Sequence, residues 1–245
     1  MKTMKEQMNE AFANLNAKAF IANDPIQIVH EMAARPNATM ADIEICAIWT
    51  AMLAWGRRDQ IISNAKQLME VCHWQPADFV RLGDFYDLSD NMNIHRTIKG
   101  KQFKAVNHNL RATYNKVPSV ADYLKMNSSS VAGLITDLSE SLQPARLGSI
   151  SRNSACKRIN MLLRWMVRKD DIDFGLWANN NNIQPSELYA IMDIHVAQQA
   201  QKMGLISYPK ESWKAVLELT HVYRSWDAAD PLKYDFVLMT NDFRK

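Results

Sequence analysis

Glycine is scarce in this chain, with seven residues in 245. That is less than half the average frequency of about 7% in soluble proteins. Tight hairpin turns and glycine-rich phosphate loops both need backbone at positive φ, which glycine adopts most readily. The scarcity therefore counts against sheet-rich folds and glycine-rich nucleotide loops. Because no alternation of polar and apolar residues persists beyond a few positions, an all-α protein is expected.

Cysteine is also rare, and its three residues are far apart: Cys46, Cys72 and Cys156. An odd number without a Cys-x-x-Cys pair matches neither a disulfide framework nor a zinc or iron–sulfur motif. Free thiols are typical of a reducing compartment, so a cytoplasmic protein is expected. Asp193, His195 and His221 raise the question of a metal site. The chain has no His-x-His or His-x-x-x-His spacing, and we expect neither a metal nor a cofactor.

A long apolar run is absent as well. The most apolar stretch, residues 43–55, contains Glu44 and is shorter than the ~20 residues that cross a bilayer. The N-terminal residues alternate charged and apolar side chains, unlike a secretion signal. We therefore expect no membrane association, and we interpret residues 43–55 as a buried core helix.

The net charge is only +3, but the basic residues are distributed unevenly. Two runs without acidic residues, 91–116 and 151–169, each carry six lysines and arginines. Concentrated basic surface is the usual footprint of a polyanionic partner, although solvated helix faces carry such charge too. The side chains expected to form one basic groove are Arg96, Lys99, Lys101, Lys104, Arg152, Arg164 and Arg168.

Helix start and stop patterns cover most of the chain. Asp24-Pro25 and Pro76 are typical helix starts, and Gly56 follows a long apolar segment as a helix stop. Residues 143–154 are expected to form a loop. The expected helices cover residues 24–32, 39–55, 59–72, 76–82, 103–114, a short segment from 119, 128–142, 157–168 and 193–204.

Residues 157–168, KRINMLLRWMVR, carry the most informative pattern. Their aliphatic side chains recur at helical spacing and should face the core. Neighbouring arginines would disfavour the charged form of Lys157, and Schiff-base chemistry needs a lysine with a depressed pKa. An ordinary solvated lysine near a helix N-terminus is the plainer alternative. The side opposite the core should carry Lys157, Met161, Arg164, Trp165 and Arg168.

Asp193 stands where a helix N-cap is expected, and Gly204 stands where that helix should end. On local grounds, a capping aspartate is the default interpretation of Asp193.

The segments around Lys157 and Asp193 also resemble those of a known family. SACKRINMLLRWMVRKDDIDFGLW, YAIMDIHVAQQAQKMGLI and DPLKYDFVL resemble a bacterial family described as domain of unknown function 2400. The upstream stretches DPIQIVHEM, EICAIWTAMLAWGRRDQIISNAKQLME and IHRTIKG resemble the same family, so the resemblance covers most of the chain. More remotely, that family resembles the helix-hairpin-helix DNA glycosylases, in which a lysine at a helix start precedes an aspartate that caps a later helix.

The archaeal branch of that superfamily, which excises oxidised guanine, has a long insertion between the lysine and the aspartate. Here 36 positions separate Lys157 from Asp193, which is nearer to that branch than to the bacterial endonucleases. The resemblance implies that Lys157 attacks the sugar C1′ while Asp193 stabilises positive charge on the sugar. Both side chains should then line one cleft, roughly 3 to 7 Å apart.

The hairpin before the lysine departs from the superfamily pattern. It reads LGSISRNSA over residues 147–155, with Gly148 retained and Ser151 where a second glycine is usual. Backbone amides of such a turn hold a DNA phosphate, so Gly148 and Ser151 are expected at a backbone contact. A second alignment places Asn153 at the lysine position, where an amide cannot form a Schiff base. The proline expected shortly before Asp193 is missing.

We therefore expect an all-α, two-lobed fold of the helix-hairpin-helix DNA glycosylase type, with lobes of residues 39–166 and of 1–38 plus 167–245. The expected function is a monomeric base-excision glycosylase with abasic-site lyase activity on damaged double-stranded DNA, with 8-oxoguanine as the first candidate lesion. The alternatives are a nucleic-acid-binding protein without chemistry and a helical protein-interaction scaffold. The aromatic candidates for stacking on a flipped base are Trp49, Trp55, Trp165 and Trp177.

Overall fold

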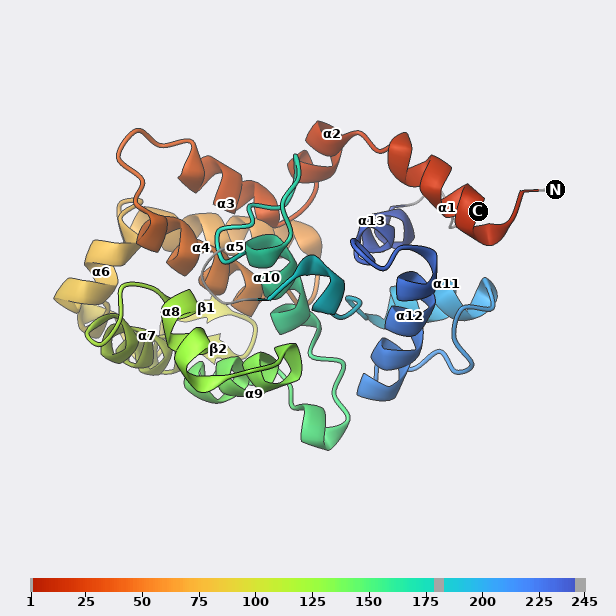
Figure 1. The fold of residues 1–245 in the computed structure, drawn as a ribbon. Coiled ribbons are helices and arrows are strands. Elements are labelled where there is room, and N and C mark those ends of the chain that lie inside the picture. The colour runs from red at the N-terminus through yellow and green to blue at the C-terminus, as the bar shows by residue number, and fades with distance from the viewer. Residues whose placement is uncertain (1, 179–182, 241–245) are drawn as a thin grey trace.

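The computed structural model describes residues 2–178 and 183–240. Over these residues it contains 13 α-helices, three short 3-10 helices and a two-stranded antiparallel sheet (Figure 1). The prediction of an all-α protein is confirmed at this level. The helices lie in two groups side by side, a larger one built from the middle of the chain and a smaller one built from both ends (Figure 1).

The larger group contains all but one of the helices that the sequence predicted, with ends shifted by a few residues; the remaining one, expected over 193–204, is α11 of the smaller group. They are α3 (Ile26–Ala33), α4 (Met40–Leu53), α5 (Arg58–Val71), α6 (Pro76–Leu82), α7 (Gly100–Tyr114), α8 (Val120–Asn127), α9 (Val131–Ser141) and α10 (Lys157–Val167). The strands β1 (Asn93–His95) and β2 (Ile98–Lys99) form a hairpin between α6 and α7. Two strands of three and two residues are too short to show an alternating pattern in the sequence.

The smaller group contains the two ends of the chain. Its helices are α1 (Met4–Ala13), α11 (Ile194–Lys202), α12 (Trp213–Trp226) and α13 (Lys233–Met239), while α2 (Ala17–Ala22) runs from α1 towards α3 (Figure 1). The short 3-10 helices are η1 (Asp84–Asp87), η2 (Ile150–Arg152) and η3 (Pro185–Glu187).

The buried apolar side chains form two clusters that match these groups. The larger cluster surrounds α4, which is buried on nearly every side, and the smaller one gathers α1, α11, α12 and α13. The domain boundary drawn from the sequence put residues 1–38 in the second lobe. In the structure α3 packs in the larger cluster, because its apolar side chains face α4.

Glu44, the one charge in the apolar stretch 43–55, is fully buried at the centre of the larger lobe. Its carboxylate accepts hydrogen bonds from the Tyr114 hydroxyl, the backbone N–H groups of Val120 and Ala121, and the indole N–H of Trp177. These bonds join α4 to α7, to the start of α8 and to the segment after α10. A buried carboxylate with this many donors is part of the framework.

The helix α10 corrects one expectation. Its residues 159–167 are all buried, and Arg164 and Arg168 are at most 3% exposed. Arg164 Nε lies 3.2 Å from Asp173, while Arg168 lies 3.1 Å from Asp173 and 2.8 Å from Asp230. The prediction that these arginines face a basic DNA groove is therefore wrong. They are interior cations because three aspartates, Asp170, Asp173 and Asp230, neutralise them.

Asp235 of α13 is fully buried, and its Oδ2 accepts the backbone N–H of Ile191 at 3.1 Å. Burial raises the pKa of Asp235 to about 7, against the opposing charge of Arg164 and the Ile191 N–H. Between the unfolded value of about 4 and this folded value, the folded state binds the proton more tightly. The free energy of unfolding contributed by Asp235 therefore falls as the pH rises through this window.

Asp235→Asn should flatten this pH dependence, because an asparagine keeps an acceptor for Ile191 and cannot ionise. Between about pH 5 and pH 8 the wild type should lose on the order of 1–3 kcal/mol of unfolding free energy relative to the variant. Urea unfolding of both proteins at the two pH values measures the difference. If the unfolding free energy changed with pH by the same amount in both proteins, Asp235 would not be the group responsible.

Candidate functional site

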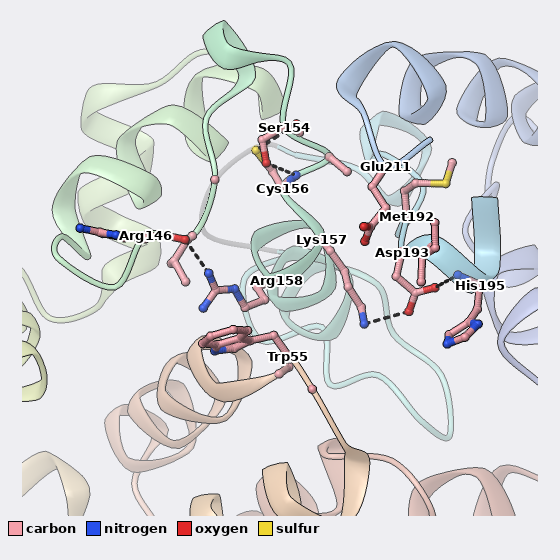
Figure 2. A pocket seen from close by; sticks show the side chains of 16 residues that line it. Trp55, Arg146, Ser154, Cys156, Lys157, Arg158, Met192, Asp193, His195 and Glu211 are labelled. Atoms are coloured by element: carbon pink, nitrogen blue, oxygen red, sulfur yellow. Dashed lines mark hydrogen bonds and ion pairs between the residues drawn. The ribbon is translucent and has the colours of Figure 1, made fainter. Parts of the chain in front are cut away.

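Lys157 and Asp193 meet at the border between the two lobes. Lys157 is the first residue of α10, and Asp193 is the N-cap of α11. The Lys157 Nζ lies 2.9 Å from the Asp193 Oδ2, and the two side chains are 30% and 23% exposed (Figure 2). The ion pair is therefore partly open to solvent, unlike the arginine pairs deeper in α10.

The pair lies in a cleft of about 540 Å³. Its walls come from the end of α4, the loop before α10, the start of α11 and Glu211 ahead of α12. Lys157 is the single lysine among the described residues that line the cleft. The two residues that the resemblance singled out thus lie together in one cleft that is open to solvent.

The loop between α9 and α10 is bent sharply just before Lys157. Arg146, Gly148, Asn153 and Cys156 all have positive φ, at 52°, 111°, 56° and 47°. A Cβ at Gly148 would lie 2.6 Å from the Ser154 hydroxyl, so this position requires glycine. Positive φ is uncommon in other residues, and such residues gather at functional sites. The bend starts α10 inside the cleft.

Asn153 has a different role from Lys157. Its Oδ1 accepts the backbone N–H of Lys214 at 3.1 Å, and its carbonyl accepts that of Trp213 at 3.1 Å. These bonds attach the loop of residues 147–155, called the hairpin from here on, to the start of α12. Asn153 is not among the residues that line the cleft. The structure therefore places Lys157, rather than Asn153, at the position from which a side chain enters the cleft.

Each carboxylate oxygen of Asp193 has its own partners. Oδ1 accepts the N–H groups of His195 at 3.0 Å and Val196 at 2.9 Å, which is the N-cap interaction expected from the sequence, and Oδ2 faces Lys157. Burial raises the pKa of Asp193, but the charge of Lys157 and the Val196 N–H outweigh it, so the pKa lies below its ordinary value. The carboxylate is therefore ionised at neutral pH and balances the lysine.

The comparisons with known proteins give one positive result. The model of a family described as protein of unknown function, DUF2400, matches residues 24–244. The chain belongs to this family. No curated protein and no solved structure matches the chain. The family match spans both lobes and includes Lys157 and Asp193, and it carries no assigned activity.

Trp55 is the aromatic residue that lines the cleft of this DUF2400 protein (Figure 2). The guanidinium of Arg96 lies 4.2 Å from the Trp55 ring centroid, and that of Arg158 lies 5.9 Å from it. His95 Nε2 lies 2.9 Å from the Trp55 carbonyl oxygen, and Arg158 donates to the carbonyl of Met52 at 2.8 Å. The two hydrogen bonds hold the backbone at the end of α4, and the Arg96 guanidinium lies over the Trp55 ring.

The other three stacking candidates are corrected by the structure. Trp49, Trp165 and Trp177 are at most 1% exposed and belong to the larger core. Trp49 donates its indole N–H to Asn107, and Trp177 donates to Glu44. They cannot stack on a base without unfolding their surroundings.

The remaining basic candidates differ in exposure. Arg96, Lys99, Lys101 and Arg152 are exposed, whereas Lys104 is partly buried and pairs with Asp90 at 2.8 Å. Gly148 lines the cleft, and Ser151 is exposed on η2. Their contact with DNA stays a prediction.

The sequence did not single out Arg146 and Arg158, which line the cleft from the hairpin and from α10. Arg158 donates to the Arg146 carbonyl at 2.5 Å (Figure 2). The adjacency of Arg158 to Lys157 was the only sign of this role in the sequence.

No group of three or more His, Cys, Asp or Glu side chains among the described residues is arranged to hold a metal ion. Within residues 2–178 and 183–240, none of the helices is long and apolar enough to cross a bilayer.

The two roles of Asp193 predict different costs for two substitutions. Asp193→Asn should change the free energy of unfolding by less than about 1 kcal/mol, because asparagine caps as well and a partly exposed ion pair contributes little. Asp193→Ala also removes the cap and should cost about 1 kcal/mol more. Urea unfolding at neutral pH measures both. Equal stabilities of the two variants would show that the cap contributes nothing.

Proposed function

We propose that this DUF2400 protein is a base-excision DNA glycosylase with abasic-site lyase activity, acting on a damaged base extruded from double-stranded DNA. The observation that carries the proposal is the Lys157–Asp193 pair: an amine and a carboxylate 2.9 Å apart in a cleft between two helical lobes. Schiff-base chemistry at a sugar requires an amine nucleophile, and a neighbouring carboxylate can stabilise the positive charge that develops.

The chain segment that leads to Lys157 supports a fold like that of the helix-hairpin-helix glycosylases. The helix α9 leads into the bent hairpin, and α10 begins directly after it with Lys157. Gly148 lines the cleft at this hairpin, where a phosphate contact is proposed. The lobe that supplies Asp193 lies across the cleft from this hairpin (Figure 2).

The proposed reaction uses the neutral form of Lys157, whose proton passes to water, while Asp193 stays a carboxylate because its pKa is low. The neutral amine bonds to C1′ of the extruded nucleotide. The bond from C1′ to the base breaks, its electron pair leaves with the base, and the base takes up a proton from water. The Asp193 carboxylate, 2.9 Å from the Lys157 Nζ, faces the positive charge that develops at the sugar and the amine.

The covalent intermediate follows from the same amine. The bond from C1′ to the ring oxygen O4′ then breaks, O4′ takes up one proton from the Lys157 nitrogen, and the bond between Lys157 and C1′ becomes a protonated Schiff base. Loss of a C2′ proton then expels the 3′ phosphate and breaks the strand. Water releases the lysine and restores the enzyme.

Lys157→Gln tests the nucleophile, because glutamine keeps a polar side chain of similar length without the amine. Borohydride reduction on duplexes that carry oxidised purines, oxidised pyrimidines, alkylated bases or an abasic site should trap the wild type. The variant should give no trapped complex and should still bind the duplex. Asp193→Asn should slow base release by about a hundredfold or more. Lys202→Gln, an exposed lysine of α11, is the matched control and should behave as the wild type.

The outcomes separate the alternatives. Binding of duplex DNA with neither trapping nor base release across the panel would leave a nucleic-acid-binding protein without chemistry. Absence of binding even at low salt would favour a protein-interaction scaffold.

The salt dependence of binding tests the proposed DNA surface. The affinity for undamaged duplex should fall with a log–log slope of about −0.9 per phosphate neutralised. Arg152 lies on the exposed η2 turn of the hairpin. Arg152→Ala should make the slope shallower by about 0.9, the value for the loss of one phosphate contact. Arg81→Ala, an exposed arginine on α6, is the control and should leave the slope unchanged. Equal slopes for wild type and Arg152→Ala would remove the hairpin from the DNA surface.

A further inference from the structure

A second cavity adjoins the cleft and does not include the Lys157–Asp193 pair. It measures about 430 Å³ and shares Trp55, Arg146 and Arg158 with the cleft. Its remaining walls come from the turn between β1 and β2, the start of β2, α7 and the loop after α9. The Arg146 side chain points away from the Lys157–Asp193 pair (Figure 2). This cavity is therefore a separate compartment beside the site of the proposed chemistry.

The polar side chains of this second cavity are suited to donate hydrogen bonds. Among the described residues that line it there are two arginines and neither an aspartate nor a glutamate. Gln102 also lines it, and its Oε1 accepts the backbone N–H of Lys99 at 3.0 Å, so the polar atom that remains is the N–H₂ donor. The Thr97 hydroxyl adds a further donor. A cavity with two guanidinium groups and no carboxylate is suited to an anion.

Arg158 differs from the two other arginines of α10. Arg164 and Arg168 are neutralised by aspartates, whereas Arg158 is half-buried and makes no ion pair within residues 2–178 and 183–240. Its guanidinium donates to the carbonyl of Met52 at 2.8 Å and to that of Arg146 at 2.5 Å. A guanidinium has more N–H donors than these two carbonyls use, so donors remain for a ligand.

The charge of Arg158 is left without a counter-ion. Burial lowers the pKa of Arg158 to about 10, because the charged form loses solvation there. Withdrawing a cation from water is costly unless an anion balances it. An anion bound in the second cavity would supply for Arg158 the compensation that aspartates supply for Arg164 and Arg168.

A phosphate group at a strand end fits this charge better than a phosphate within a strand. Guanidinium groups bind phosphate oxygens through paired N–H donors. A phosphomonoester carries about −1.5 to −2 charges at neutral pH, which two guanidinium groups balance. A diester within a strand carries a single charge. The proposed lyase step makes such a monoester, because it expels the 3′ phosphate of the reacting nucleotide as the 5′ end of the downstream strand.

We propose that the second cavity binds the 5′-phosphate that the lyase step leaves on the cleaved strand, and that Arg146 and Arg158 hold it. The inference rests on the proposed lyase activity for the source of this phosphate and adds a product-binding site. Lys157 directly precedes Arg158 in α10, so the phosphate is released beside the residue that binds it. The cavity then retains the new strand end after the strand has been broken.

Binding to preformed gaps tests this inference without any chemical step. Two duplexes of identical sequence carry a one-nucleotide gap, with a 5′-phosphate on the downstream strand of the first and a 5′-hydroxyl on that of the second. Fluorescence anisotropy measures the affinity of the protein for each duplex at the same salt concentration. The wild type should bind the phosphate duplex about tenfold or more tightly than the hydroxyl duplex, because only the phosphate pairs with the two guanidinium groups.

Two substitutions assign the preference to the cavity. Arg146 is exposed, so Arg146→Gln should leave the fold intact and reduce the ratio of the two affinities about threefold or more. Arg158→Lys keeps the positive charge but loses the planar pair of donors, and it should reduce the ratio to a similar extent. Arg81→Gln, at an exposed arginine of α6, is the control and should keep the wild-type ratio. Retained affinity for the hydroxyl duplex shows that a variant is folded.

The outcomes distinguish this inference from the proposed function, which borohydride trapping tests separately. Equal affinities of the wild type for the two duplexes, or no binding to either, would overturn the inference even if the protein traps abasic DNA. A phosphate preference that both arginine variants keep would place the phosphate elsewhere and would also overturn it. A preference that both variants lose, in a protein that neither traps DNA nor releases a base, would support the phosphate site and remove the lyase step as its source.

Discussion

The buried charge network of α10 is the constraint on which the rest of the structure depends. Arg168 pairs with Asp173 in the larger lobe and with Asp230 just ahead of α13, so one guanidinium binds both lobes. Arg164 pairs with Asp173 and lies 4.1 Å from the ring centroid of Phe236 in α13. Removing one member of a buried pair typically costs about 3–5 kcal/mol, because the other charge stays behind. The network therefore fixes how α10 sits between the lobes, and with it the position of Lys157.

The same helix carries cations in two environments, and burial decides their roles. Arg164 and Arg168 are enclosed by aspartates and hold the fold together. Lys157, at the exposed end of α10, faces one carboxylate whose other oxygen caps α11. Because backbone N–H groups of His195 and Val196 hold the Asp193 carboxylate, its position does not depend on Lys157 alone. The bent hairpin before α10 restrains Lys157 in turn, because it makes α10 begin inside the cleft.

Local patterns predicted the helices well because their ends are determined by nearby atoms. Thr39 and Asp42 form reciprocal hydrogen bonds at the start of α4, and Pro76 begins α6, as the sequence indicates. The closeness of Lys157 and Asp193 came from the resemblance, since 36 intervening positions carry no geometric information of their own.

The wrong predictions concern side chains whose hydrogen-bond or ion-pair partner is distant in the chain. Helical spacing alone puts Arg168 on a solvated face, because Asp230 is 62 positions away and no local pattern announces it. Trp177 looked available for stacking, but Glu44, 133 positions earlier, buries its indole N–H.

The most direct test of the account is to locate the covalent bond. The protein is reduced with borohydride on a duplex that carries an abasic site, digested with trypsin and examined by mass spectrometry. An adduct on Lys157 blocks cleavage there, so the sugar should appear on the peptide of residues 153–158, which ends at Arg158. An adduct on any other lysine, or the absence of an adduct, would contradict the assignment of Lys157 as the nucleophile.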